Sequence, residues 1–343
     1  MIAALDFEKP IVELEKKIAE LKNLSSDGSL NLDSEVKKLE ARLALAKKEV
    51  YLNLTPWQRV QIARHPRRPY TLDYIQALFT DFIEIHGDRT FADDKALVGG
   101  LARFEGRPCI VMGHQKGRDA KENIMRNFGS AHPEGYRKAL RLMNMAQKFG
   151  MPIIAFVDTP GAYPGVGAEE RGQAYTIAVN IREMARIDVP IIVCVIGEGG
   201  SGGALGIGVG DRVLVLENAY YSVISPEGCA AILWKDRTMA PEAAAALKLT
   251  AKDLLEMKLI DDIVEEPAGG AQKNLQEITD SVKQAIDRHL KELEGRDRKA
   301  LVEARYEKFR AIGVYQEAQI ETLEKIYAKN EKKARRKKMA SAK

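Results

Sequence analysis

The sequence predicts an α/β protein built around a mainly parallel sheet. Two apolar segments, residues 152–158 and 190–196, have nearly the same sequence, Pro-Ile-Ile-Ala-Phe-Val-Asp and Pro-Ile-Ile-Val-Cys-Val-Ile. Their apolar residues stand at consecutive positions, as in strands that are buried on both faces of a parallel sheet. A glycine-rich turn and then a helical pattern follow each segment. Such repeated strand, turn and helix units predict coiled α/β layers, which we expect in one core domain, residues 55–270.

Length and composition exclude several classes of protein. The chain has 343 residues, of which 45% are hydrophobic, so it can bury a full core and is neither disordered nor collagen-like. No segment approaches the ~20 apolar residues of a membrane span, and residues 1–6 turn acidic too early for a signal peptide. The three cysteines lack C-x-x-C spacing, and the five histidines never pair at i+3 or i+4. We therefore expect a cytoplasmic protein with reduced thiols and no metal site.

The net charge of +4 comes from the C-terminal end of the chain. Residues 325–343 hold nine basic residues and one acid, a sum of +8, so residues 1–324 sum to −4. The basic character therefore does not indicate a nucleic-acid-binding domain. We expect residues 329–343 to be a solvated, disordered tail, with a contact to an anionic partner as the alternative.

The first fifty residues predict a helical hairpin. Apolar residues recur at helical spacing in residues 8–24 and 34–52, and residues 25–29, Ser-Ser-Asp-Gly-Ser, are typical of a turn between them. The apolar stripe on each helix is narrow and needs another surface to cover it. We therefore assign residues 1–54 to packing or to a subunit interface.

The core domain begins with irregular structure and then a hairpin of strands. Residues 56–69 are basic and interrupted by prolines, which predicts a segment without regular structure, and a short helix is expected over 72–82. Residues 97–104 and 109–114, separated by the turn Glu-Gly-Arg-Pro, predict two paired strands.

Alternating helices and strands follow. Pro133 suits the first turn of a helix and Gly150 its end, and the strand at 152–158 comes next. The following helix should turn Ala174, Ile177 and Ala178 inward, together with the isoleucine at 181. After the strand at 190–196, a further strand is expected at 212–217, and residues 271–328 return to a charged helical pattern.

The most specific feature is the glycine run that follows the strand at 190–196. Residues 199–210 contain seven glycines, each of which costs backbone entropy, up to about 1 kcal/mol in a helix. Close approach of a second backbone or of a ligand would explain them. Amides at the start of a helix near Gly202 would lack partners and form a site for an oxygen that gains negative charge, where one donor stabilises a transition state by roughly 2.7–4 kcal/mol.

A second turn occupies the equivalent place in the repeat. Residues 159–167 read Thr-Pro-Gly-Ala-Tyr-Pro-Gly-Val-Gly and follow the strand at 152–158. Both turns then lie at the carboxyl ends of parallel strands, where α/β proteins bind ligands. The alternative is that both are only tight connections between strands and helices.

The glycine run also contains the pattern Gly199-x-Ser201-x-Gly203 of hydrolase nucleophile elbows. A serine acyl hydrolase or peptidase of Clp-like fold that uses Ser201 is therefore an alternative. It would need a histidine, and after Ser201 only His289 follows, within the charged helical region. A chance match is also common in so glycine-rich a segment.

Several motifs taken together resemble the alpha subunit of the carboxyltransferase component of acetyl-CoA carboxylase, in the multi-subunit form of bacteria and plastids. They occur in the same order as in that family, over roughly residues 5–320. The matching segments are residues 64–66, 68–74, 113–118, 133–141, 158–165, 197–205 and 222–229.

The resemblance implies the crotonase fold, a spiral of β-β-α units, and an α2β2 assembly with a separate beta subunit. It further implies transfer of a carboxyl group from carboxybiotin, held on the biotin carboxyl carrier protein, to acetyl-CoA. The product is malonyl-CoA, in the first committed step of fatty acid biosynthesis. Biotin carboxylase completes the complex, biotin is not attached to this chain, and the family's zinc site belongs to the beta subunit.

The implied reaction suggests roles for particular residues. We expect the amides of Gly203 and Ala204 to form an oxyanion hole for the biotin ureido oxygen, with Gly202 permitting its approach. Substrate-binding residues would come from both turns and from the segment after the strand at 109–114: Gly161, Ala162, Tyr163, Gly199, Gly200, Lys116 and Arg118. The last two would meet a carboxylate or a CoA phosphate, unless they are ordinary solvated charges. A scaffold that only binds a beta-like partner is the remaining alternative.

Overall fold

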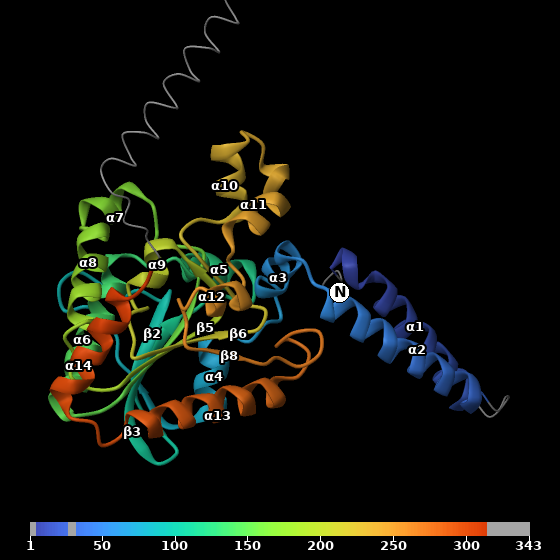
Figure 1. Ribbon diagram of the computed structural model, residues 1–343, viewed down its shortest axis with the longest axis horizontal. Coiled ribbons are helices and arrows are strands. Elements are labelled where there is room, and N and C mark those ends of the chain that lie inside the picture. Colours follow the sequence, from blue (N-terminus) through green and yellow to red (C-terminus); the bar gives the residue numbers. More distant parts are fainter. Residues whose placement is uncertain (1–4, 27–31, 314–343) are drawn as a thin grey trace, which may run out of the picture. The chain divides into compact units, whose positions relative to one another are not determined.

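An eight-stranded sheet organises the described residues, 5–26 and 32–313, of the computed structural model (Figure 1). The strand order is β1-β2-β3-β4-β5-β6-β8, with β7 paired to β5. Strands β1, β2 and β3 are antiparallel, and the pairs from β3 onward are parallel. The bounds are β1 (Phe79–Glu84), β2 (Leu97–Phe104), β3 (Arg107–His114), β4 (Ile153–Thr159), β5 (Ile191–Gly200), β6 (Arg212–Leu216), β7 (Tyr220–Ser222) and β8 (Asp262–Val264).

The two similar apolar segments are the central neighbours β4 and β5. Every residue of both strands is buried, and their parallel register pairs Ile153 with Ile191 and Ile154 with Ile192. The predicted parallel core is therefore confirmed. Because the strands run in the same direction, the two glycine turns that follow them lie at one edge of the sheet.

Helices cover both faces of this sheet. A side chain at Gly99 in β2 would meet Leu142 of one helix, whereas a side chain at Gly113 in β3 would meet Thr71 of another. Gly113 pairs with Val98, the neighbour of Gly99, so the two glycines face opposite sides of the sheet. The helices are α1 (Lys9–Ser26), α2 (Asp33–Leu52), α3 (Pro56–Ala63), α4 (Thr71–Leu78), α5 (Ala120–Met125), α6 (Pro133–Phe149), α7 (Val166–Glu170), α8 (Gln173–Met184), α9 (Ser201–Leu205), α10 (Pro226–Leu233), α11 (Ala240–Leu247), α12 (Ala251–Glu256), α13 (Leu275–Leu293) and α14 (Arg298–Arg310).

The segment that was expected to be irregular begins with helix α3. Thr55 caps this helix, since its hydroxyl accepts a hydrogen bond from the Gln58 amide and the Gln58 side chain accepts one from the Thr55 amide. Pro56 stands at the first helical position, where proline is favourable. The next predicted helix is shorter than expected, because α4 ends at Leu78 and the chain continues as β1.

Helix α8 turns only part of its predicted apolar face inward, because Ile177 and Ile181 pack against the core as expected. Ala174 and Ala178 are exposed, and the buried face carries Gln173, Thr176 and Asn180. Each of these polar side chains donates a hydrogen bond to a backbone carbonyl group. The prediction was thus right for the two isoleucines and wrong for the two alanines, because apolar periodicity cannot identify the polar part of a buried face.

The two predicted N-terminal helices are present as α1 and α2. Ile11 and Ile18 of α1 and Val36 of α2 are buried. The carboxylate of Glu8, just before α1, accepts a hydrogen bond from Tyr51 Oη at 2.6 Å and pairs with Lys273 Nζ at 3.3 Å. The hairpin is thus bound to the segment before α13, and its role as an interface stays a prediction.

A buried arginine holds α14 beside the amino-terminal ends of β5 and β6. The guanidinium of Arg305 binds both carboxylate oxygens of Asp211, at 2.9 and 2.7 Å, and three backbone carbonyl groups before β5. The described residues up to Arg310 form one compact unit. The division into residues 1–54, 55–270 and 271–328 stays a prediction, and the expected basic tail, 329–343, lies outside the described residues.

The cysteines are as expected: Cys109, Cys194 and Cys229 are buried free thiols. Among the described residues, no helix has the length and apolar character to cross a bilayer. Within the same ranges, no three His, Cys, Asp or Glu side chains converge as a set of metal ligands.

Candidate active site

The two glycine turns touch through their backbones at the carboxyl ends of β4 and β5. A Cβ atom at Gly203 would lie 2.5 Å from the Ala162 amide nitrogen, and a Cβ at Gly200 would lie 2.2 Å from the Pro160 carbonyl oxygen. Both distances are far below van der Waals contact, so only glycine fits at these two positions. The structure therefore brings Gly161 and Ala162 beside Gly203, at the one edge of the sheet where the sequence predicted both turns, and explains two of the clustered glycines.

Helix α9 starts inside the glycine run. Ser201, Gly202 and Gly203 form its first turn, whose amides have no carbonyl group of their own helix to bind. Ala204 is the first residue whose amide can bond back within the helix, to the carbonyl of Gly200. Gly202 is half-buried, whereas Gly203 and Ala204 are buried. Among the predicted donors, Gly202 and Gly203 thus have the freest amides, and Ala204 stays a further candidate.

Ser201 has the backbone conformation of a nucleophile elbow without its chemistry. Its φ of 51° is in the left-handed region, and the residue is exposed. Within the described residues, no histidine hydrogen-bonds to Ser201. His289 is held on α13 between Asp262 and Glu292, at 3.2 Å from each. Burial lowers the pKa of His114 to about 3, so that side chain is a poor base.

We expect Ser201→Ala to keep most of the activity, within about threefold of the parent. Alanine and serine meet a similar backbone strain at positive φ, so the turn should be unchanged. The measurement is the turnover number of the assembled enzyme. A loss on the order of a thousandfold would support a nucleophilic serine instead.

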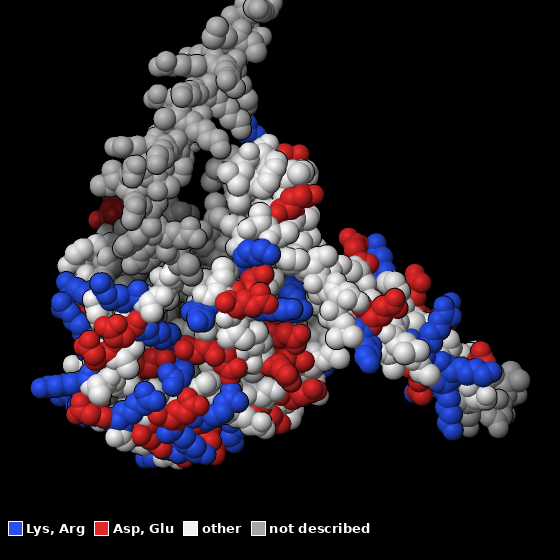
Figure 2. All heavy atoms as spheres, viewed as in Figure 1, with Lys and Arg blue, Asp and Glu red and all other residues white. Residues whose placement is uncertain are grey.

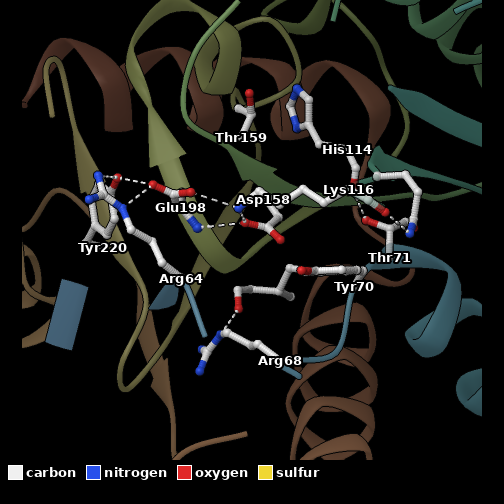
Figure 3. Close-up of polar contacts among 12 residues, drawn as sticks. Arg64, Arg68, Tyr70, Thr71, His114, Lys116, Asp158, Thr159, Glu198 and Tyr220 are labelled. Carbon is white, nitrogen blue, oxygen red and sulfur yellow. Dashed lines mark hydrogen bonds and ion pairs between the residues drawn. The ribbon is translucent and has the colours of Figure 1, made fainter. Parts of the chain in front are cut away.

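A largely buried lysine joins the strands just before both turns (Figure 3). Lys116 Nζ lies 2.6 Å from Asp158 Oδ1 and 2.9 Å from Glu198 Oε1. The Lys116 side chain is 11% exposed, and those of Asp158 and Glu198 are 1% and 8% exposed. Burial disfavours the ammonium ion, but the two carboxylates outweigh this effect and raise the pKa of Lys116. The structure therefore places this predicted substrate ligand in an ion cluster that connects the two turns.

Glu198 is also bound from its other side. Arg64 Nε and Tyr220 Oη approach Glu198 Oε2 at 2.7 and 2.6 Å (Figure 3). Arg64 also pairs with Glu227 at the start of α10. Burial alone would raise the pKa of Glu198, but the charges of Lys116 and Arg64 lower it to about 2. Sequence reasoning missed this cluster. The available signal was an acidic residue near the carboxyl end of each similar strand, at positions 158 and 198.

Arg118 lies in a different environment from Lys116. Its guanidinium stands over the Tyr70 ring, 4.1 Å from the ring centroid, and pairs with Asp73. The Arg118 side chain is 42% exposed, so a ligand could reach it. Tyr163, in the first turn, stacks on His132 with 4.1 Å between ring centroids.

Comparison with known proteins identifies the family. Residues 4–313 match the family described as "Acetyl co-enzyme A carboxylase carboxyltransferase-like". The acetyl-coenzyme A carboxylase carboxyl transferase subunit alpha of Thermus thermophilus is 60% identical over 313 residues, 91% of this chain and 99% of the relative. The same subunit of Geobacter metallireducens is 59% identical, over 91% of this chain and 98% of the relative. The chain belongs to this carboxyltransferase family.

Solved structures agree on the fold of the carboxyltransferase alpha subunit. A Pseudomonas malonate decarboxylase hetero-tetramer, solved with coenzyme A, aligns with a TM-score of 0.56 at 17% identity, over 68% of this chain and 91% of that chain. Transcarboxylase 12S aligns with a TM-score of 0.50 at 19% identity, over 72% and 43%. The predicted crotonase-like fold and the predicted function, the alpha subunit of acetyl-CoA carboxylase carboxyltransferase, are confirmed. Neither the hydrolase nor the scaffold alternative is favoured.

Large apolar side chains of this carboxyltransferase subunit are exposed around the glycine turns. Leu205 on α9 is 43% exposed, and Val166 and Val223 are more than 70% exposed. Ile232 and Leu233, at the end of α10, are also exposed, and the surface over α10 and α11 is largely uncharged (Figure 2). Apolar surface of this kind around a site is typical of protein interfaces.

Proposed function

We propose that this chain supplies one half of the site that moves the carboxyl group from carboxybiotin to acetyl-CoA. The observation that carries the proposal is the backbone contact between the two glycine turns, which places free amides beside a turn of small residues. Carboxyl transfer in this family needs donors for oxygens that gain negative charge, and it needs no side-chain base from this chain. Amides that are already oriented stabilise such oxygens without reorganising during the reaction.

The glycine turns suit the biotin ring because their outer faces are open. A side chain at Gly202 would meet only Ile177 Cδ1 at 3.7 Å, and one at Gly161 would meet only Ser201 Cβ at 4.0 Å. Carboxybiotin, when bound, supplies CO2, and its ureido group accepts the proton of the acetyl methyl group. The amides of Gly202 and Gly203 donate hydrogen bonds to the ureido oxygen, and Ala204 is a further candidate donor. Gly161, Ala162 and Tyr163 line the biotin pocket, beside Gly199 and Gly200.

We assign the other half of the site to a carboxyltransferase beta subunit in an α2β2 assembly, which would hold most of acetyl-CoA. The exposed apolar residues around the turns support a partner at this edge. The biotin carboxyl carrier protein would deliver biotin, and biotin carboxylase would complete the complex, in the cytoplasm. Arg118 is the better candidate for a carboxylate or a CoA phosphate, because Lys116 would first have to leave two buried carboxylates.

Co-expression with a beta subunit tests this proposal. The assay is malonyl-CoA-dependent carboxylation of free biotin, measured for each chain alone and for the complex. Turnover by the complex, and by neither chain alone, is the expected result. A complex that assembles but does not carboxylate biotin would favour a scaffold, and turnover by the isolated alpha chain would contradict the shared site.

A further inference from the structure

The glycine run is held from behind by the hydroxyl group of a buried tyrosine. Tyr136, on α6, is fully buried, and its Oη donates a hydrogen bond to the Gly203 carbonyl oxygen at 3.2 Å. The next carbonyl groups of α9 are bound differently, since the Ala204 carbonyl accepts from the Ile207 amide. Burial raises the pKa of Tyr136, so its hydroxyl stays a donor at all ordinary pH values.

A second buried side chain holds the end of the same segment. Asn180 Nδ2, on α8, donates hydrogen bonds to the carbonyl oxygens of Tyr136 and Gly206, each at 2.9 Å. Gly206 lies directly against the Tyr136 ring, because a Cβ at this glycine would be 2.5 Å from two ring carbon atoms. Tyr136 and Asn180 therefore bind this segment to α6 and α8 at the Gly203 carbonyl of α9 and at the carbonyl of its C-cap residue, Gly206.

These contacts matter because α9 cannot hold itself. It has only five residues, and isolated helices shorter than about 12 residues are only marginally stable in water. Gly202 and Gly203 are flexible, and Ser201 has a strained, positive φ. The Gly203 carbonyl and the Ala204 amide belong to one rigid peptide plane. Fixing the carbonyl oxygen on Tyr136 thus fixes the direction of that plane and of the neighbouring amides.

We propose that Tyr136 is a positioning residue for carboxyl transfer, and that Asn180 supports it. This inference rests on the proposed use of the Gly202 to Ala204 amides as donors to the ureido oxygen. Tyr136 touches no substrate. It sets the orientation of donors on the far side of α9, where a misplacement of about 1 Å can cost on the order of a hundredfold in rate.

The chain offers a matched control for the loss of this hydroxyl. Tyr74 is also fully buried, but its hydroxyl has no hydrogen-bond partner among the described residues, and its ring stacks on Phe156. Removing the Tyr74 hydroxyl therefore changes a buried tyrosine in the same sheet core without touching α9.

The experiment compares Tyr136→Phe with Tyr74→Phe in the complex with the beta subunit. For Tyr136→Phe we expect kcat for biotin carboxylation to fall about 10- to 100-fold, with KM for malonyl-CoA within twofold of the parent value. For Tyr74→Phe we expect kcat and KM within twofold of the parent. A general loss of packing would instead lower thermal stability in both variants, and it would not lower kcat in Tyr136→Phe alone while KM stays unchanged.

Equal kcat values in the two variants would overturn the role of Tyr136. If Gly203→Val is then inactive, the proposed donor role of the amides stands and only the role of Tyr136 fails. If Gly203→Val is active, the proposed donor role itself fails. Asn180→Leu, which keeps the side-chain volume and removes both donated hydrogen bonds, decides the question should Tyr136→Phe not fold. An unchanged kcat in Asn180→Leu would also overturn the proposal.

Discussion

Replacing Gly203 by valine is expected to lower carboxyl transfer about 100- to 1,000-fold while the alpha and beta subunits stay associated. Even the first carbon of the new side chain would lie 2.5 Å from the Ala162 amide nitrogen and from the Gly161 carbonyl carbon. These are backbone atoms, so the two turns must separate. The separation moves the Gly203 amide away from the biotin pocket, and losing one such donor costs about 100- to 1,000-fold in kcat.

The effect should be local because β4 and β5 remain paired below the turns. Overpacking of this kind costs about 1–3 kcal/mol, which a core of this size tolerates. Gly202→Ala is the comparison variant, because its methyl group would meet only Ile177 at ordinary contact distance. Gly202→Ala should fold and assemble as the parent does, and its activity shows how closely the biotin ring approaches residue 202. Size-exclusion chromatography measures the assembly of each variant, and the biotin carboxylation assay measures its activity. An active Gly203→Val complex would contradict the assignment of the Gly203 amide as an oxyanion donor.

The sheet could be predicted because its signals are local in the sequence. The runs at 152–158 and 190–196 are almost continuously apolar, as buried parallel strands are, and the glycines after the second run favoured close approach of a backbone or a ligand. Parallel pairing then placed both turns at one edge of the sheet. The contact between Gly203 and Ala162 follows from that geometry and from no single residue.

The polar groups beneath the turns could not be predicted in this way. Lys116 meets Asp158 and Glu198 across 42 and 82 positions of sequence, and a lone lysine after a strand is more often solvated. The buried face of α8 was missed for a related reason, since Asn180 is polar and its neighbours Ala174 and Ala178 are apolar but exposed. Hydrophobic patterning locates the core, whereas buried polar contacts depend on which elements the fold brings together.

Replacing Lys116 by methionine is expected to lower the free energy of unfolding by about 3 to 5 kcal/mol, because two buried carboxylates lose their shared cation. Arg64 and Tyr220 still bind Glu198, but within this cluster Asp158 keeps only the Glu198 amide as a partner. The repulsion between the carboxylates should push apart the strand ends that carry both turns. We therefore expect activity to fall together with stability, measured by chemical denaturation and by the biotin carboxylation assay.

The dependence on pH separates this explanation from a simple loss of packing. In the parent the pKa of Glu198 is lowered to about 2 from 4.5, so its contribution to stability is complete above pH 4.5 and is lost as the pH falls toward 2. Without Lys116 the carboxylate pKa values rise, and the variant gains stability as these groups take up protons. The difference in unfolding free energy between the parent and Lys116→Met should thus narrow as the pH falls from 7 to 4.

The control variant is Lys308→Met, at the opposite ends of the strands. It removes the ion pair with Asp261 and should destabilise the chain while activity is retained. A difference between Lys116→Met and the parent that is independent of pH would show that the ammonium charge is not what holds the turns together.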